Sequence, residues 1–420
     1  MAIPFRGRIG RLGVNTVYSS IAMGARAVMQ AAYLVVLSRS MGPGDYGLFA
    51  GSVAAAVLLA PLAGWGIPFL LAERIAKAPE AQRGWWAGAL LQTVVTGSAL
   101  AVFVLLGVLA MHDRVGVGAM VLLVLAELVF VPISPAASML LLTLGRGAAG
   151  ALVVCLVPAG RLLAVGALLL SGHAMDPSTV ATMHVVGSVA GALSVVAVVR
   201  VVAGAAQWRE RPRLREMFGS GTRYAFGLLF GIAYTEVDKV LLLQLAGGTI
   251  AGLYTAAFRV VAVLVLPVSA LTSNALPRLF AAAGTPEWQR VFRAVVLASA
   301  GYAAAAIAVA LFVAPWLPVV FGAGFGPSSD ILWMLSPWIV LCAAHQVAAT
   351  GLTSLGHQGD RVAIEGGGLA FVIAANVALV PMLGARGSVL ALLATESAIL
   401  VACAWRLSRV LGRQPRPQTT

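Results

Sequence analysis

The chain has 420 residues, of which 60% are hydrophobic and only 10% are charged, and its formal net charge is +13. A water-soluble protein carries about 25% charged residues, so this composition excludes a soluble enzyme or a soluble binding domain. Its apolar runs are long and continuous, without the alternation of membrane strands, and they predict membrane-spanning helices.

Twelve apolar segments follow one another along the chain, and each is long enough for the roughly 20 residues that cross a bilayer. The sequence therefore predicts an all-α polytopic membrane protein. The basic start of the first segment is not followed by a cleavage site, which favours an uncleaved first helix. The expected spans are 12–38, 45–72, 84–110, 116–142, 147–170, 178–202, 219–246, 251–276, 290–314, 328–355, 361–382 and 385–408.

The basic residues alternate from loop to loop. With the N terminus in the cytoplasm, the cytoplasmic segments carry twenty arginines and lysines, and the opposite side carries only Arg39, Arg114 and Arg386. This asymmetry follows the positive-inside rule and predicts that both termini are cytoplasmic. The net positive charge is thereby assigned to cytoplasmic loops and anionic lipid headgroups, not to nucleic acid.

A passage of the first half recurs in the second half. Gly47-Leu48-Phe49 falls on Gly252-Leu253-Tyr254 at an offset of 205 residues, and Pro61 falls on Pro267 after one insertion. Paired halves in an apolar chain are typical of transporters, whose substrate path lies between the halves.

The most charged stretch, WRERPRLRE at 208–216, lies between the sixth and seventh spans. It divides the chain into an N-terminal six-helix bundle (1–207), a basic cytoplasmic linker (208–218) and a C-terminal six-helix bundle (219–420). A solvated loop that contacts lipid phosphates is favoured over a specific partner for the linker.

Polar residues of the first span form one stripe. At about 100° per residue, its polar residues fall within roughly 60° of one another; they are Asn15, Ser19, Arg26, Gln30 and Tyr33. The repeat offset maps the last four onto Tyr224, Gly231, Thr235 and Asp238 of the seventh span. We expect both faces to line a shared, water-filled cavity; the alternative is polar packing between helices.

Two arginines at membrane depth are candidate ligands for an anion. Arg26 lies near the middle of the first span, and Arg259 lies in the eighth span near Tyr254. A guanidinium donates two parallel hydrogen bonds, which suits a phosphate or a carboxylate. The alternative for Arg259 is a side chain that extends to the membrane interface.

Other buried charges are interpreted as structural. We expect ion pairs between Glu127 and Arg161, between Glu236 and Lys239, and between Arg361 and Glu365. His184 and His345 are interpreted as hydrogen-bonded core residues. Ionisable groups at this depth usually pair with one another or face a cavity.

Small residues and prolines carry weaker signals. Gly187 and Gly191 have the spacing of closely packed helices. The three cysteines have no metal-ligand spacing and are read as buried thiols. Kinks are expected at prolines inside the spans, which are Pro61, Pro132, Pro135, Pro158, Pro267 and Pro337.

Several passages together resemble the bacterial polysaccharide transporters, the Wzx-like oligosaccharide flippases. In the first half these are LSRSMGPGDYGLFA and GWGIPFLLAERIA. In the second half they are EVDKVLLLQLAGGTIAGLYTAAFRV, ALPRLF, FGAGFGPSSDILWMLSPW and NVALVPMLGARGSVLALLATE. The resemblance extends over nearly the whole chain, and it places the chain in the exporter superfamily that also contains multidrug exporters and lipid II flippases.

The resemblance implies a fold, a substrate and a location. Members have two six-helix bundles arranged as a V, and those of this branch move undecaprenyl-pyrophosphate-linked oligosaccharide across the bacterial cytoplasmic membrane by alternating access, for cell-surface polysaccharide biosynthesis. The expected partners are this lipid-linked substrate, membrane lipids and the polysaccharide polymerase machinery.

The resemblance also implies roles for single residues. Arg26 and Arg259 would contact the pyrophosphate, in a cavity that also includes Gln30, Tyr33 and Tyr254. Residues that match an ion-coupling site are Asp238, Thr235, Asn376 and Thr395. Leu379 and Val380 occupy the region where a second carboxylate would complete a sodium site, which leaves Na⁺ coupling, H⁺ coupling or no coupling open. No other cofactor and no metal site is expected.

The main alternative is a multidrug exporter, whereas a membrane enzyme and a lipid II flippase fit the sequence less well. A multidrug exporter of the same superfamily is expected to have a more acidic or aromatic cavity. A membrane enzyme needs a large outer loop or paired carboxylates, whereas the outer acids here are isolated at Asp45, Asp113, Asp176 and Asp330. Lipid II as the substrate suggests more than twelve spans.

Overall fold

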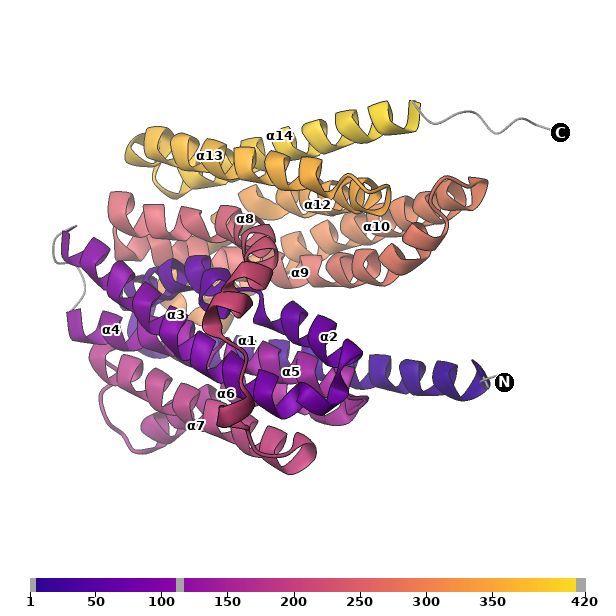
Figure 1. The fold of residues 1–420 in the computed structure, drawn as a ribbon. Helices are drawn as coiled ribbons and strands as arrows, with labels where there is room; N and C mark the ends of the chain where they lie inside the picture. Colours follow the sequence, from indigo (N-terminus) through magenta and orange to yellow (C-terminus); the bar gives the residue numbers. More distant parts are fainter. Residues whose placement is uncertain (1–4, 111–116, 413–420) are drawn as a thin grey trace. The chain divides into compact units, whose positions relative to one another are not determined.

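The computed structural model describes residues 5–110 and 117–412, and their side chains except at 5–17, 19, 20, 107–110, 117, 120, 223, 224, 226–228 and 277. Every regular element in these residues is a helix (Figure 1), which confirms the all-α fold class. The α-helices are α1 (Phe5–Gly64), α2 (Ile67–Lys77), α3 (Gln82–Ala110), α4 (Val117–Leu125), α5 (Ile133–Thr143), α6 (Gly147–Leu170), α7 (Pro177–Ala203), α8 (Leu214–Ala246), α9 (Gly248–Ala281), α10 (Pro286–Val313), α11 (Leu317–Phe321), α12 (Ser328–Ser354), α13 (Gln358–Leu383) and α14 (Ala385–Gly412). Shorter helical turns cover Pro79–Ala81, Ala126–Phe130, Trp208–Glu210, Ala314–Trp316 and Ala323–Phe325.

The number of long apolar segments agrees with a polytopic membrane protein. Within the described residues, ten helical segments are long and apolar enough to cross a bilayer. The first of them, Ile21–Lys77, has 57 residues and extends over both of the first two expected spans. Helix α8 covers the expected seventh span but is not among the ten, and it carries Glu236, Asp238 and Lys239 within one turn.

The chain divides into two compact units. The first unit comprises Met1–Met41 and Ser52–Ile232, and the second comprises Gly42–Gly51 and Ala233–Thr420. The division therefore falls inside α8, and ten residues of α1 pack with the second unit. The bundle boundaries expected from the repeat and the basic linker stay a prediction.

The first two expected spans are separated by a break in the backbone instead of a long loop. Helical geometry is interrupted at Gly42, whose φ is 72° and ψ is 174°. A second break lies inside the expected span 45–72, directly after α1, where Trp65 and Gly66 have φ values of 40° and 71°. It lies shortly after Pro61, one of the prolines expected to mark a kink. Glycine adopts such positive φ values without the steric cost that a Cβ imposes.

The two passages that repeat in the sequence pack against each other inside the second unit. A Cβ at Gly47 would lie 1.7 Å from the Gly248 carbonyl oxygen, and a Cβ at Gly252 would lie 2.1 Å from the Pro43 carbonyl oxygen. Only glycine permits this approach of the two backbones. The repeated glycines are therefore a packing device as well as a trace of duplication.

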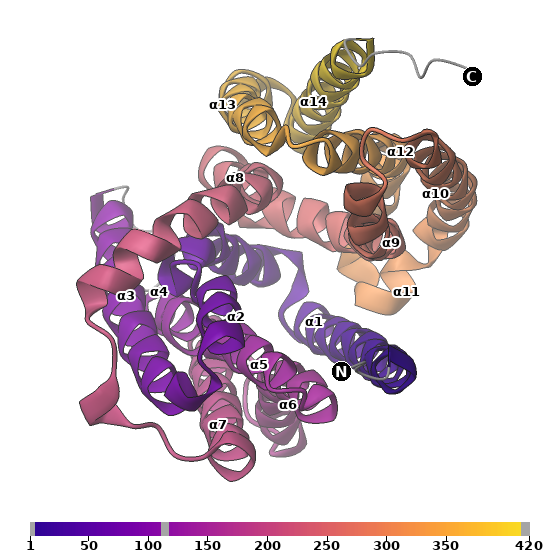
Figure 2. The ribbon, with the colours of Figure 1, turned by 45° about the vertical axis from the view of Figure 1, so that its right-hand side comes forward.

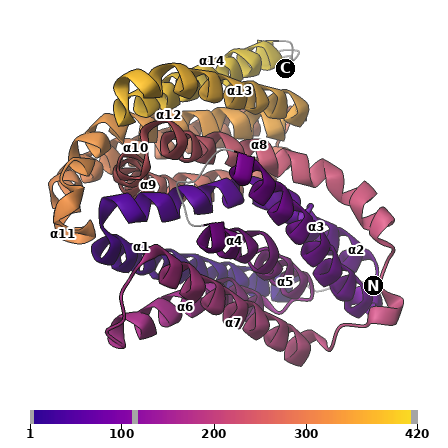
Figure 3. The ribbon, with the colours of Figure 1, turned by 90° about the vertical axis from the view of Figure 1, so that its left-hand side faces the viewer.

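Glycines also bring α6 and α7 together in the first unit, where the two helices run side by side (Figure 2, Figure 3). A Cβ at Gly187 would lie 2.5 Å from the Gly160 carbonyl oxygen, and one at Gly191 would lie 2.6 Å from the Val157 Cα. The spacing of Gly187 and Gly191, a weak signal in the sequence, thus marks a close contact between helices, and this contact determines which polar side chains meet there.

Candidate functional site

A buried ionic cluster lies in the first unit and consists of Glu127, Arg161 and His184, called the first-unit cluster below. Arg161 Nη1 lies 2.9 Å from Glu127 Oε1, and His184 Nε2 lies 3.1 Å from the same oxygen. Arg161 Nε also donates to Ser188 Oγ at 2.8 Å. These contacts confirm the predicted Glu127–Arg161 pair and the interpretation of His184 as a hydrogen-bonded core residue.

Local sequence explains how these three side chains meet. Glu127 lies on the π-helical turn Ala126–Phe130, just before Pro132. Such turns often occur at functional sites, because they shift the register of a helix face. Arg161 follows Gly160 directly, and the close approach of Gly160 to Gly187 brings it beside α7.

Tyr33 of α1 extends the first-unit cluster. Its hydroxyl lies 2.7 Å from His184 Nδ1, and only 6% of its surface is exposed. With Nε2–H donated to Glu127, Nδ1 of a neutral imidazole accepts a hydrogen bond from the Tyr33 hydroxyl. The ring therefore has both nitrogens satisfied without carrying a charge.

Arg26 and Gln30 differ from Tyr33 in exposure, although all three belong to the predicted stripe. Both side chains are exposed in the described part of the chain. Beside this stripe α1 packs on α6, where Cys155 Sγ donates to the Ala22 carbonyl oxygen at 3.4 Å, one helical turn before Arg26. The side chains of Asn15, Ser19 and Tyr224, which complete the predicted stripes, lie outside the described residues.

Asp238 is the centre of a second polar group, in the second unit. Lys239 Nζ donates to Asp238 Oδ1 at 3.1 Å, and the Tyr254 hydroxyl donates to Asp238 Oδ2. Lys239 also donates to the Thr235 carbonyl oxygen, lies 3.7 Å from Glu236 Oε2, and sits 3.6 Å from the centre of the Phe258 ring. The predicted Glu236–Lys239 pair is thus confirmed, and the same Lys239 ammonium also forms an ion pair with the Asp238 carboxylate.

The remaining residues of the predicted ion-coupling site bond to their own helices. Asn376 Nδ2 donates to the Val372 carbonyl oxygen at 2.8 Å, and Thr395 Oγ1 donates to the Ala391 carbonyl oxygen at 2.7 Å. Both are fully buried. Because the Lys239 ammonium already occupies the place of a cation beside Asp238, these residues do not fit a Na⁺ ion.

Arg259 is half-buried on α9 and lies within electrostatic range of Tyr46 in the same unit. Arg259 Nε and the Tyr46 hydroxyl are both buried, and neither has a hydrogen-bond partner among the described residues. Buried donors without a partner are unusual in folded proteins. This pair therefore offers unused hydrogen-bond donors to a ligand oxygen.

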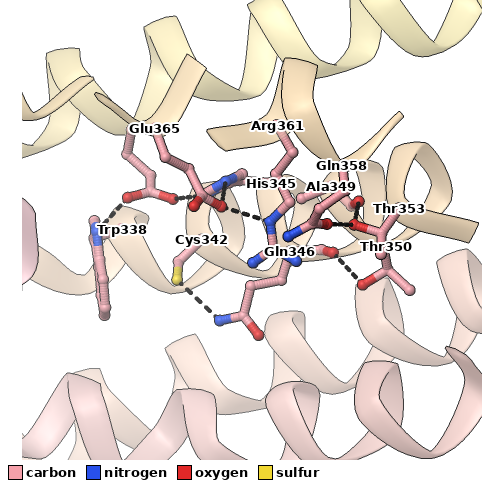
Figure 4. Close-up of polar contacts among 11 residues, drawn as sticks. Trp338, Cys342, His345, Gln346, Ala349, Thr350, Thr353, Gln358, Arg361 and Glu365 are labelled. Carbon is pink, nitrogen blue, oxygen red and sulfur yellow. Dashed lines mark hydrogen bonds and ion pairs between the residues drawn. The ribbon is translucent and has the colours of Figure 1, made fainter. Parts of the chain in front are cut away.

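A second ionic cluster, the second-unit cluster, consists of the buried His345, Glu365 and Glu396 and the half-buried Arg361. His345 Nδ1 lies 2.7 Å from Glu396 Oε1, and Arg361 Nε lies 2.7 Å from Glu365 Oε1. His345 Nε2 lies 3.8 Å from Glu365 Oε1, and Trp338 Nε1 donates to Glu396 Oε2 at 3.1 Å. Figure 4 shows His345, Glu365 and Arg361 pointing toward one another from α12 and α13. The predicted Arg361–Glu365 pair is confirmed.

Sequence reasoning missed the contacts that connect these groups. It treated His345 as an isolated core residue and assigned no role to Glu396, although the two form a direct pair. It also placed Tyr33 in a cavity without its histidine partner. The signal that identified Glu127 with Arg161, equal distance from one turn, does not exist for His345 and Glu396, because α13 separates their helices in the sequence. Among the described residues, no group of His, Cys, Asp and Glu side chains has the arrangement of a metal site.

Comparison with known proteins gives the chain a family and a fold. Over residues 12–282 the sequence matches the family described as polysaccharide biosynthesis protein. Among curated proteins, none matches the chain in sequence. One similar solved structure is the inward-facing conformation of a multidrug resistance MATE family transporter of the MOP superfamily, with a TM-score of 0.75 at 15% identity over 94% of this chain and 100% of that chain.

Two further solved structures have the same fold. The outward-facing conformation of a multidrug resistance MATE family transporter of the MOP superfamily has a TM-score of 0.69 at 14% identity, over 95% of each chain. A MOP superfamily transporter from Pyrococcus furiosus, described as having a binding pocket of reverse polarity that suggests a different function, has a TM-score of 0.69 at 15% identity over 96% of each chain. At these identities the likeness concerns the fold alone.

Proposed function

The chain belongs to the polysaccharide biosynthesis protein family, and on that premise we propose that it translocates undecaprenyl-pyrophosphate-linked oligosaccharide across a membrane by alternating access. The family and the fold are those of transporters. The step proposed beyond them is the substrate: a lipid with a pyrophosphate and a saccharide headgroup.

The observation that carries this proposal is Arg26. It lies in the middle of an apolar helix and its side chain is exposed. Its guanidinium lies within electrostatic range of Glu127 and Arg161, but Glu127 is already paired with Arg161 at 2.9 Å. A lone guanidinium at membrane depth is costly and normally serves a ligand or a pathway. A guanidinium donates two parallel hydrogen bonds to the oxygens of a pyrophosphate, whereas its positive charge repels a cationic drug.

Arg259 supports the same substrate class from the second unit. Its unpaired Nε and the unpaired Tyr46 hydroxyl are donors without acceptors, which an anionic headgroup supplies. In this proposal Gln30 binds polar atoms of the headgroup. Tyr33 and Tyr254 are buried and form hydrogen bonds with His184 and Asp238, respectively. In this proposal they position the faces of α1 and α9 that the substrate contacts.

The proposed membrane and the orientation of the chain in it rest on the charge of the loops. Twenty basic residues on one side against three on the other support a bacterial cytoplasmic membrane with both termini in the cytoplasm. Anionic lipids are then the partners of the basic loops, and the saccharide delivered to the outer leaflet is the substrate of a polymerase for a cell-surface polysaccharide.

The experiment that tests the proposal measures leaflet accessibility of a labelled undecaprenyl-pyrophosphate saccharide in proteoliposomes. We expect the wild-type protein to expose lipid from the inner leaflet, and Arg26→Ala to slow this exposure at least tenfold, because one bidentate charged contact contributes about 1.5–3 kcal/mol. Arg200→Ala, at the exposed end of α7, is the matched control and keeps the wild-type rate.

Two results contradict the proposal. If wild-type protein moves none of this lipid, the substrate is wrong. If Arg26→Ala and Arg200→Ala transport equally well, Arg26 is not on the substrate path. Efflux of cationic dyes in place of the lipid would support the multidrug-exporter alternative.

A further inference from the structure

Each of the two units contains one buried pair of a histidine and a glutamate, and the two residue types lie on opposite helices in the two units. In the first unit, Glu127 of the fourth expected span pairs with His184 of the sixth. In the second unit, the corresponding spans contribute the opposite partners, because His345 lies on the fourth and Glu396 on the sixth. Each unit thus joins the same two spans through one imidazole and one carboxylate.

The charges of the first-unit cluster balance without an additional proton. One carboxylate, Glu127, is opposed by one guanidinium, Arg161, at 2.9 Å. His184 is neutral in this arrangement, since it donates to Glu127 and accepts from Tyr33. Arg26 adds a further positive charge within electrostatic range of Glu127 and Arg161, so this cluster has no excess of carboxylates.

The second-unit cluster has one more carboxylate than the first. Glu365 and Glu396 are both at most 3% exposed, and only one guanidinium, Arg361, is present to oppose them. A buried charge without compensation is costly, and the protein interior avoids it by pairing or by protonation. One proton on the cluster restores neutrality.

The geometry provides a place for that proton. His345 Nδ1 is 2.7 Å from Glu396, while His345 Nε2 is 3.8 Å from Glu365 and is buried without a hydrogen-bond partner. An imidazolium donates from both nitrogens, so a protonated His345 opposes both carboxylates at once. A neutral His345 with both carboxylates ionised leaves one negative charge unopposed.

The surroundings of the cluster offer no second cation among the described residues. The other titratable groups in electrostatic range are Tyr234 of α8, Cys342 of α12 and Cys403 of α14. From α9, Phe258 packs on Trp338, whose indole N–H donates to Glu396. None of these groups supplies a positive charge.

We propose that the second-unit cluster is a proton-binding site that holds one proton on His345, between Glu365 and Glu396, and that its protonation is coupled to transport. Binding adds a proton from water to the imidazole, and release returns it to water and leaves two carboxylates opposed by Arg361 alone. The coupling rests on the proposed function, whereas the proton-binding site does not.

The site itself is tested by spectroscopy on the full-length protein in lipid nanodiscs. Nitrogen NMR of ¹⁵N-histidine-labelled protein at about pH 7 should show one doubly protonated buried histidine, assigned by its loss in His345→Gln, and a neutral His184. Glu396→Gln and Glu365→Gln each remove one carboxylate, so in both variants His345 should become neutral. His173→Gln, in an exposed loop, should leave the His345 signals unchanged.

The spectra also contain the result that overturns the site. Infrared spectroscopy detects a protonated carboxylic acid if the proton lies on Glu365 or Glu396 instead of His345. A neutral His345 together with two ionised carboxylates in the wild type rules out a bound proton. The charge states are read on the wild-type protein, and His345→Gln serves only to assign the His345 signals. A folding defect in Glu365→Gln or Glu396→Gln therefore does not decide the outcome.

The coupling is tested separately in proteoliposomes with the membrane potential clamped at zero. One coupled proton predicts that a gradient of one pH unit shifts the distribution of labelled lipid between the leaflets by about tenfold. Glu396→Gln should abolish this shift, and His173→Gln should retain it. If the proton gradient does not change the distribution of labelled lipid in vesicles with the wild-type protein, the proposed coupling is wrong. Absence of lipid movement under any gradient contradicts the proposed function, and the spectra then decide on the proton site alone.

Discussion

Single residues show how buried charge is handled in this chain. Glu127 opposes Arg161 at 2.9 Å, and the exposed fractions of their side chains are 5% and 13%. By contrast, Lys77 and Glu73 pair across one helical turn at the surface, where the lysine side chain is 71% exposed. The two pairs have similar distances, but solvent screens only the second.

Replacing Glu127 with alanine should therefore destabilise the protein strongly. The substitution leaves the Arg161 guanidinium buried without its carboxylate, and breaking a buried pair in this way costs about 3–5 kcal/mol. The measurement is the free energy of unfolding in detergent. Lys77→Ala is the matched control, because an exposed pair contributes about 0–1 kcal/mol. Equal losses in the two variants would contradict the account of the first-unit cluster.

The residue scale also shows where sequence reasoning succeeded and failed. The Glu127–Arg161 pair was predictable because both residues lie at equal distance from one turn between neighbouring helices. The contacts Tyr33–His184 and His345–Glu396 join helices far apart in the sequence, and lone histidines carry no spacing signal. The exposure of Arg26 beside a buried Tyr33 depends on how α1 packs on α6, which no periodicity specifies.

Among the helices, α7 has a well-formed N-terminal cap. Asp176 Oδ1 accepts from the backbone N–H groups of Ser178 and Thr179 at 3.0 and 3.1 Å, and the carboxylate also accepts from both hydroxyls. These donors, the Ser178 hydroxyl foremost, hold the pKa of the Asp176 carboxyl below its usual range. The charged carboxylate therefore stabilises the first turn of α7.

The pH dependence of this cap has a defined sign. Because the folded pKa is depressed, the stabilisation is fully present above the unfolded value of about 3.9 and is lost as pH falls toward the folded pKa. Amide hydrogen exchange in the first turn of α7 should lose protection below about pH 4. Asp176→Asn keeps a capping side chain without a titrating group, so its protection should not follow pH. Identical pH profiles for wild type and variant would refute this role.

The packing of α1 on α9 depends on the absence of side chains at Gly47 and Gly252. A Cβ at Gly252 would meet the Pro43 carbonyl oxygen at 2.1 Å, whereas a Cβ at Gly301 of α10 meets no atom within 4 Å. Gly252→Ala should therefore lower the midpoint of thermal unfolding by several degrees. Gly301→Ala should leave the midpoint unchanged or raise it, since alanine is favoured over glycine in a helix by about 0.5–1 kcal/mol. If both variants unfold like the wild type, the close backbone contact is not present in solution.

At this scale the sequence predicted more than where helices lie. The repeated Gly-Leu-Phe and Gly-Leu-Tyr passages indicated a duplicated architecture, and they are also the segments in contact. What could not be predicted was the interruption of α1 at Gly42, because its φ of 72° reflects the packing of residues 42–51 with the second unit. Local propensity gives no information about such tertiary constraints.

For the whole molecule, composition and charge were sufficient to predict a polytopic helical membrane protein, and the family match over residues 12–282 agrees with that prediction. In the proposed function, the substrate class depends on a few side chains at membrane depth, above all Arg26 and Arg259. Their guanidinium groups favour an anionic lipid headgroup over a cationic drug.

The most direct test of this account compares the two substrate classes in one preparation. Proteoliposomes that contain the wild-type protein are loaded with a labelled undecaprenyl-pyrophosphate saccharide in the inner leaflet and a cationic dye in the lumen, and both are followed under the same proton gradient. The account predicts protein-dependent exposure of the lipid at the outer leaflet and no efflux of the dye above that of protein-free vesicles. Dye efflux without exposure of the lipid would contradict it.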